Sequence, residues 1–206
     1  MIVLRHLVLL ALVLGLVVGL AGCGDSGGSK ASEGTTASTQ TTTGGDDNDC
    51  VPIGEAGLTP RMSPALQNRK MMYLTDVSID SKDECRQQVV FDLEKQAPGP
   101  GFEVSYKPAS AVKIEDGSGK PIAVDGVAFL VVRLYPAMTA KIDGDRVTKT
   151  YTGPNRIKSE DSFVREVVKT GDFEGYVTWA IGLDQKRAFT TKASESQLVV
   201  ELAGTS

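Results

Sequence analysis

The feature that most constrains the fold is a hydrophobic period of two that continues almost to the C-terminus. Alternating apolar residues recur in the segments 89–93, 102–106, 112–114, 177–183 and 198–202. Successive side chains of a β-strand point to opposite faces, so this pattern is typical of strands with one buried face. The sequence therefore predicts a domain built from short strands.

Turn-forming residues separate these segments, and the longest apolar run lies between two of them. The run Val127 to Tyr135 is apolar on both faces except at Arg133, which favours a central strand covered on both sides. No segment has a helical period, although residues 159–168 could form one helical turn before their strand. The turns are Pro98-Gly99-Pro100-Gly101, Asp116-Gly117-Ser118-Gly119, Asp125-Gly126, Asp143-Gly144-Asp145 and Gly153-Pro154. This organisation predicts an all-β fold, a two-sheet antiparallel β-sandwich over residues 71–206.

The segment 50–70 differs from the rest because it carries three prolines and no sustained period, so we expect an irregular N-terminal arm. If Cys23 is modified, Cys50 and Cys85 remain as an even pair. In a compartment that permits disulfides this predicts a bridge that pins the arm; two reduced thiols are the alternative. In the loop-entropy model such a bridge contributes roughly 3 to 4 kcal/mol.

The first 22 residues have the pattern of a lipoprotein signal peptide. Arg5 supplies a positive charge, and residues 7–20 form an uncharged apolar run that is short of the ~20 residues a spanning helix needs. The sequence Leu20-Ala21-Gly22-Cys23 resembles the bacterial lipobox, in which a peptidase cuts before an acylated cysteine. We therefore expect lipidation of Cys23 and anchoring at the extracytoplasmic face of the cell membrane. An ordinary secretory signal ending near a cysteine is the alternative.

Residues 23–49 predict a flexible linker after the lipidated cysteine. Of the residues 24–49, 16 of 26 are Gly, Ser or Thr, a composition that cannot bury a core. Such a tether has a root-mean-square reach of roughly 28 Å. The acidic stretch Asp46-Asp47-Asn48-Asp49 has no ordered ligand geometry, and we interpret it as solvated charge rather than a cation site.

Charge and histidine content exclude several classes of function. The formal net charge is −4, and Lys and Arg are scattered, so no nucleic-acid footprint is present. The one histidine is His6, inside the predicted leader, which excludes a Ser-His-Asp triad, a Cys-His dyad and His-containing zinc sites in the mature chain. We expect a monomer that is not an enzyme and that uses no cofactor or metal.

The densest group of Gly, acidic and aromatic residues is the segment 171–175. Asp172, Phe173, Glu174 and Tyr176 are candidate ligand-binding residues, because loops gather at the end of a sandwich. The alternative is a bulge or tight turn in which Phe173 fills the core.

Trp179 could be a carbohydrate platform, but its alternation with Val177, Ile181 and Leu183 favours the core, while Tyr176 and Thr178 point the other way.

Several motifs together are similar to those of one family. They are Val89-Val90-Phe91; Gly101-Phe102 with Val104 and Tyr106; Asp116 to Gly119; Gly153-Pro154; Gly171 to Gly175 with Trp179 and Ile181-Gly182-Leu183; and Leu198-Val199-Val200. Over roughly residues 72 to 203 the chain resembles the AMIN-like domain of lipoproteins from high-GC Gram-positive bacteria. In that family an acidic residue and an Arg often precede Val-Val-Phe, whereas Gln87 and Gln88 stand here. The resemblance implies an extracytoplasmic β-sandwich, and related AMIN domains localise envelope proteins through peptidoglycan.

Three functions compete on this basis. The first is a non-catalytic module that binds a cell-envelope partner, either cell-wall polymer or another envelope protein. The second is a carrier of a lipid or small hydrophobic ligand inside the sandwich, suggested by the apolar run. The third is an enzyme that uses carboxylates or a Ser-Lys pair, which the scattered acidic residues support least.

Overall fold

The computed structural model describes residues 50, 53–65, 69–112, 115–160 and 162–204. The expected signal peptide, Cys23 and the expected linker 23–49 lie outside this part of the chain. Within it, no helix is long and apolar enough to cross a membrane.

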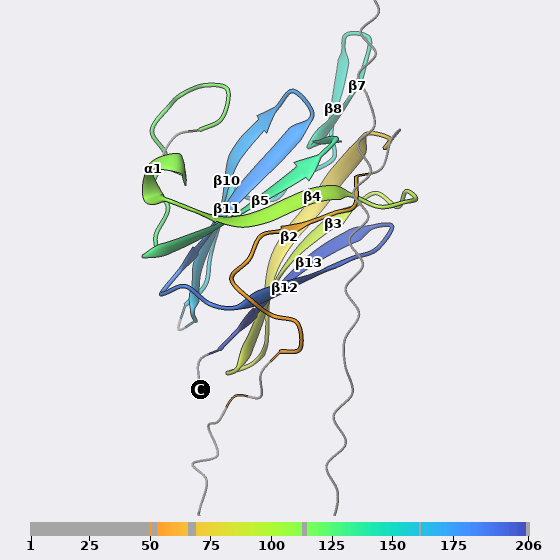
Figure 1. Ribbon diagram of the computed structural model, residues 1–206. Coiled ribbons are helices and arrows are strands. Elements are labelled where there is room, and N and C mark those ends of the chain that lie inside the picture. The colour runs from red at the N-terminus through yellow and green to blue at the C-terminus, as the bar shows by residue number, and fades with distance from the viewer. Residues whose placement is uncertain (1–49, 51–52, 66–68, 113–114, 161, 205–206) are drawn as a thin grey trace, which may run out of the picture. The chain divides into compact units, whose positions relative to one another are not determined.

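Two sheets face each other, as the alternation predicts (Figure 1). Neighbouring strands are antiparallel except for the parallel pair β2 and β6. One sheet has the order β1 (Arg61–Met62), β4 (Gly101–Lys107), β5 (Ala128–Tyr135), β11 (Tyr176–Leu183), β10 (Val164–Phe173), β9 (Arg156–Lys158). The other has the order β12 (Phe189–Ala193), β13 (Gln197–Ala203), β3 (Arg86–Leu93), β2 (Met72–Asp83), β6 (Ala137–Met138). A separate hairpin of β7 (Ala140–Asp143) and β8 (Arg146–Lys149) follows β6.

The main core lies between the sheets and takes side chains from both. Trp179 of β11 is fully buried and meets Phe91 of β3 edge to face, with ring centroids 6.2 Å apart. Trp179 shares its face with Val177, Ile181 and Leu183, all inaccessible to solvent. The prediction that Trp179 packs in the core is confirmed.

A second, smaller apolar cluster covers the outer face of the six-stranded sheet. Val112 of α1 (Ala109–Val112) and Val124 pack over Phe129 and Val131 of β5. The central strand is therefore covered on both faces, as its composition predicts. Val127 is different: it precedes the strand and is 76% exposed, because the chain is still leaving the Asp125-Gly126 turn.

One local expectation is wrong, and one local possibility is not realised. The alternation around Val112 predicts a strand, but Ala109–Val112 form a helical turn closed by the bond from the Ala111 N–H to the Pro108 carbonyl. Residues 159–168, which have room for a helical turn before a strand, contain none in the part described, and their strand β10 begins at Val164.

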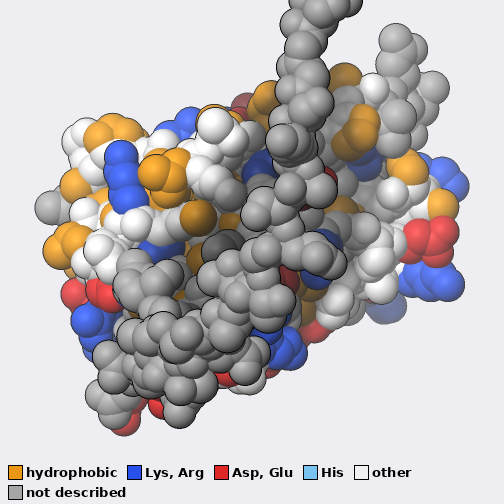
Figure 2. All heavy atoms as spheres, turned by 60° about the horizontal axis from the view of Figure 1, so that its bottom comes forward, with side chains coloured by type: hydrophobic (Ala, Val, Ile, Leu, Met, Phe, Trp, Pro, Cys, Tyr) orange, Lys and Arg blue, Asp and Glu red, His pale blue; other side chains and the backbone are white. Residues whose placement is uncertain are grey.

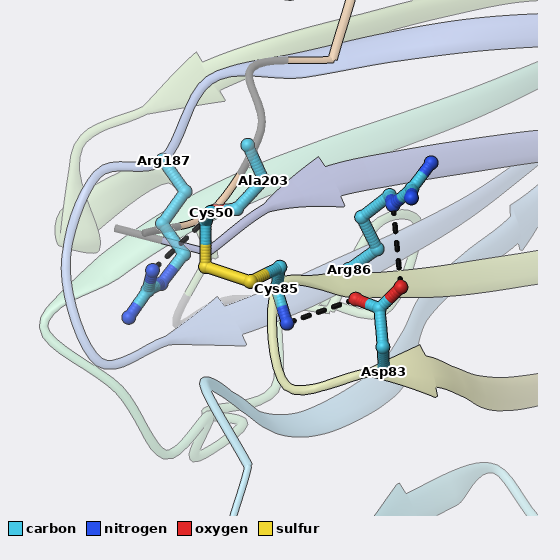
Figure 3. The surroundings of a disulfide bond; sticks show 6 residues. All are labelled: Cys50, Asp83, Cys85, Arg86, Arg187 and Ala203. Atoms are coloured by element: carbon cyan, nitrogen blue, oxygen red, sulfur yellow. Dashed lines mark hydrogen bonds and ion pairs between the residues drawn. A yellow bond between two sulfur atoms is a disulfide. The ribbon is translucent and has the colours of Figure 1, made fainter. Parts of the chain in front are cut away.

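A disulfide links the N-terminal arm to the sandwich. Cys50 and Cys85 are bridged, with a Cα–Cα distance of 5.2 Å, which agrees with the pairing predicted from the cysteine count. Figure 3 shows the bridge beside Asp83 and Arg86, at the turn between β2 and β3. Further along the arm, β1 adds an edge strand to β4.

The strands of both sheets run between two ends of the domain. The disulfide end contains the β2–β3 turn, the loop 184–188 and the C-terminal end of β13. The opposite end, here called the hairpin end, contains the β10–β11 turn at residues 174–175, the β12–β13 turn at 194–196 and the loop 94–100.

Candidate functional site

The predicted ligand-binding segment forms the β10–β11 hairpin at the hairpin end. Its two-residue turn consists of Glu174 and Gly175, both with positive φ (51° and 78°), as in the type I′ turns that close tight hairpins. The segment is therefore a tight turn. However, Phe173 does not fill the core, because its side chain is 54% exposed.

A loop packs against this hairpin at a close approach that depends on glycine. A Cβ added to Gly171 would lie 2.6 Å from Cβ of Asp116, so a larger residue would push the loop 115–119 away. The Asp116 N–H donates to the Thr170 carbonyl at 2.7 Å. In the same loop, Gly117 lies against the Phe173 ring.

Three aromatic side chains, Tyr135, Phe173 and Tyr176, together form what we call the aromatic patch. Phe173 and Tyr176 are opposite each other across the hairpin, and Tyr176 is 42% exposed. The Tyr135 and Tyr176 ring centroids are 5.8 Å apart, and the guanidinium carbon of Arg133 lies 4.8 Å from the Tyr176 centroid. Arginine over a tyrosine ring is a favourable cation–π arrangement that holds the ring in place.

The predicted acidic residues are placed differently from the aromatic ones. Asp172 and Phe173 both border a hollow of about 310 Å³, but the Asp172 carboxylate accepts a hydrogen bond from Thr139 Oγ1 and lies 3.8 Å from Lys169 Nζ. Glu174 occupies the turn. The structure thus brings Phe173 and Tyr176 together and leaves both carboxylates outside the patch.

A polar row crosses the outer face of the six-stranded sheet next to the patch. Glu103, Arg133 and Thr178 are register neighbours on β4, β5 and β11. Burial opposes ionisation of Glu103, but hydrogen bonds from Ser105 (3.0 Å) and Lys107 (3.3 Å), with the charges of Lys107 and Arg133, lower its pKa. Glu103 is therefore a carboxylate at neutral pH.

Sequence reasoning missed Arg133 and Tyr135 as members of this site. The available signal was that Arg133 is the single charged residue in an apolar strand. A charged residue inside an apolar strand indicates a specific contact of its side chain. Which residue it contacts depends on the pairing of β5 with β11.

Another hollow, of about 670 Å³, lies at the disulfide end, and several of its polar side chains are paired within the protein. The Arg187 side chain, 7% exposed, donates to Asp184 at 2.9 and 2.7 Å and lies over the Phe163 ring at 4.2 Å. Gln87 accepts a hydrogen bond from the Val164 N–H at 2.9 Å. In Figure 3, Arg187 lies beside the disulfide. Its hydrogen bond to the Ala203 carbonyl links the loop 184–188 to β13. These contacts are structural.

Charges of both signs occur on the face of the domain that Figure 2 draws, with blue and red side chains interspersed. Among the described residues there is no group of three or more His, Cys, Asp or Glu that could hold a metal ion.

Comparison with known proteins gives one match. The family model described as the AMIN-like domain matches residues 72–204, which include the aromatic patch and every strand of both sheets except β1. No curated protein and no solved structure matches the chain.

Proposed function

Because the chain belongs to the AMIN-like domain family, we propose that it is a non-catalytic module of the cell envelope. In this proposal a lipid on Cys23 holds it at the extracytoplasmic face of the membrane. Its folded domain binds a cell-envelope partner, with cell-wall polymer favoured over another envelope protein, through the aromatic patch.

The observation that carries the proposal is the exposure of ordered aromatic rings beside polar groups. Tyr176 and Phe173 are among the large apolar side chains that the described surface exposes, and Arg133 contacts the former. Rings with an apolar face and a polar rim are suited to sugars and to mixed polar surfaces, and exposed apolar groups of this kind mark interaction sites. The aromatic patch and Arg133 together present rings, two phenolic hydroxyls and one guanidinium.

The position of the disulfide suits a tethered binder. Cys50 is fixed to Cys85 at the disulfide end, and the patch lies at the opposite, hairpin end. A tether that joins the domain at Cys50 would therefore be attached at the end opposite the patch.

The packing between the sheets argues against the carrier hypothesis. Trp179 contacts Phe91 on one side and Tyr151 on the other, with ring centroids 6.2 and 5.6 Å apart. These rings, with the fully buried Leu130 and Leu198, occupy the space that a hydrophobic ligand would need.

Co-sedimentation tests the proposal. The full chain in mild detergent is mixed with purified insoluble cell wall and, separately, with cross-linked envelope proteins depleted of wall. We expect saturable binding to the wall that falls at least about tenfold in Tyr176→Ala, a loss of roughly 1.4 kcal/mol. Binding to the protein fraction alone would favour another envelope protein as the partner. Binding to neither fraction would refute the proposal.

A further inference from the structure

A hollow of about 370 Å³ lies at the disulfide end, where β4 ends, β5 begins and the loop 184–188 passes. Its charged lining residues are Lys107 and Lys186, and the rest of its lining, which includes Val127, is aliphatic or aromatic. We infer that this hollow docks on the membrane, with the lysines against the phosphate of an anionic phospholipid and Val127 in the lipid interface. This inference rests on the membrane anchoring in the proposed function and adds a second binding surface.

The charge of the hollow favours an anion. Among the described residues Lys186 takes part in no ion pair, and its ammonium lies 5.7 Å from the centroid of the Tyr106 ring. Lys107 has one acidic neighbour, Glu103, at 3.3 Å, but both side chains of this pair reach solvent. Because exposed ion pairs are weak, Lys107 can turn from Glu103 toward a phosphate. Two ammonium groups beside an apolar surface match a lipid headgroup.

The acidic residues that are close in sequence do not line the hollow. Asp184 is on the same loop as Lys186, but it is paired with Arg187 at 2.7 Å. Asp125 precedes Val127 by two residues and is not part of the lining. A phosphate that enters the hollow therefore meets the two ammonium groups without a carboxylate among the lining residues.

Val127 is held with its side chain in solvent. It is 76% exposed, and its N–H donates to the Leu183 carbonyl at 2.8 Å. The preceding Gly126 has a φ of 139° and packs so closely that an added Cβ would lie 2.7 Å from the Leu183 nitrogen. A lone exposed valine is ordinary, but one fixed beside two lysines provides both parts of an interfacial contact, an apolar group and positive charge.

The loop 184–188 connects this hollow to the disulfide. Lys186 lines the hollow, and the next residue, Arg187, lies beside the Cys50–Cys85 bridge (Figure 3). The Tyr106 hydroxyl accepts from the Arg187 N–H at 2.9 Å and donates to the Arg187 carbonyl at 2.7 Å, which fixes the loop to β4. The hollow and the bridge therefore belong to one fixed part of the domain.

The place where the expected linker joins the domain favours a lipid as the occupant. In the proposed function a lipid on Cys23 anchors the chain, and residues 23–49 lead from it to Cys50, at the disulfide end. A linker with a reach of roughly 28 Å keeps this end at a high effective concentration near the membrane. Contacts that are too weak to bind a free domain become effective under these conditions.

The test uses the full chain held on vesicles through the expected anchor at Cys23. A fluorescent amino acid replaces Val127 or, as the matched control, Val147. Val147 is 64% exposed, and its hairpin is attached at the opposite end of the domain through the ion pair of Lys141 with Glu94. The vesicles consist of phosphatidylcholine alone or of an equal mixture with phosphatidylglycerol, and carry a headgroup nitroxide that quenches nearby fluorescence. We expect quenching at position 127 on the mixed vesicles and none at position 147.

Lysine variants measure the contribution of charge. Lys186→Gln should lower the ratio of docked to undocked domain about fivefold, the contribution of one lysine near an anionic surface. Lys95→Gln is the matched control, because Lys95 is an exposed lysine paired with Glu195 in the loop 94–100 at the hairpin end. It should leave the ratio unchanged. Both lysines are exposed, so both variants should fold, which circular dichroism checks.

Several outcomes would overturn the inference. They are equal quenching at positions 127 and 147, equal quenching on the two kinds of vesicle, and equal effects of Lys186→Gln and Lys95→Gln. The same fluorescence change with inorganic phosphate in solution would make a soluble anion the occupant and would also overturn it. A chain that fails to float with the vesicles would refute the anchor together with this inference. A chain that floats without quenching at position 127 would overturn the inference alone, and cell-wall co-sedimentation would still test the proposed function.

Discussion

Arg133 and Tyr176 lie on neighbouring strands, β5 and β11, and the guanidinium carbon of Arg133 is 4.8 Å from the centroid of the Tyr176 ring. The contact is diagonal across the sheet, since the direct register partner of Arg133 is Thr178. An exposed ring held in this way keeps its orientation, so less conformational entropy is lost when a ligand binds it.

Removing the guanidinium should therefore affect binding more than stability. We expect Arg133→Met to reduce cell-wall binding severalfold and to change the free energy of unfolding by at most about 1 kcal/mol, the usual size of an exposed cation–π contact. Co-sedimentation and urea unfolding measure the two effects. The matched control is Lys186→Met, because Lys186 lies over the Tyr106 ring at 5.7 Å and belongs to the loop 184–188 at the disulfide end. An equal loss of binding in both variants would show that the patch has no special role.

The ion pair between Arg156 and Glu166 predicts an asymmetric response to mutation. Glu166 is 1% exposed and accepts from Arg156 and from the Asp125 N–H, whereas the Arg156 side chain is 38% exposed. Arg156→Met leaves a buried carboxylate without its cation and should destabilise by about 3 kcal/mol. Glu166→Gln leaves the Arg156 guanidinium where water can reach it, so this variant should lower the free energy of unfolding by only about 1 kcal/mol. Urea unfolding of both variants measures the difference, and the reverse order would contradict this account.

Loss of the disulfide should destabilise the domain through the arm. The bridge joins residues 35 positions apart, and in the loop-entropy model its removal costs about 3 to 4 kcal/mol. The double variant Cys50→Ser with Cys85→Ser should therefore unfold at lower urea concentration than the parent. Adding reductant should shift the parent toward the variant and leave the variant unchanged. Equal stability of the oxidised parent and the variant would show that the arm contributes little.

The ion pair between Asp184 and Arg187 predicts that the stability of the domain depends on pH. Hydrogen bonds from Arg187 outweigh desolvation and lower the pKa of Asp184 from its ordinary 3.8. The unfolded chain therefore binds the proton more readily than the folded chain. The stabilisation is present above about pH 4 and is lost as pH falls through the lowered value.

Asp184→Asn should accordingly be less stable than the parent at pH 7, by about 2 kcal/mol, because it also leaves the buried Arg187 without its anion. The difference between the two proteins should shrink toward pH 3. Urea unfolding at a series of pH values measures it. A difference that stays constant from pH 7 to pH 3 would contradict the assignment.

The features that the sequence predicts well are those determined by neighbouring residues. The period of two locates the strands and places Trp179 inside, and Glu174-Gly175 closes a hairpin because both residues adopt positive φ. What it misses depends on residues far apart in the chain. The helical turn Ala109–Val112 forms where Val112 can cover β5, and the orientation of Phe173 depends on the loop around Gly117. The contact of Arg133 with Tyr176 likewise requires the register of two strands.

The central claim is that the aromatic patch contacts a cell-envelope partner. Site-specific photo-cross-linking in intact envelopes tests it most directly, with a benzophenone side chain in place of Tyr176 in the full chain. The control position is Leu58, which is 54% exposed and adjoins the start of β12 at the disulfide end. The account predicts that position 176 cross-links to cell-wall material and position 58 does not. Equal cross-linking from both positions, or none from position 176, would contradict it.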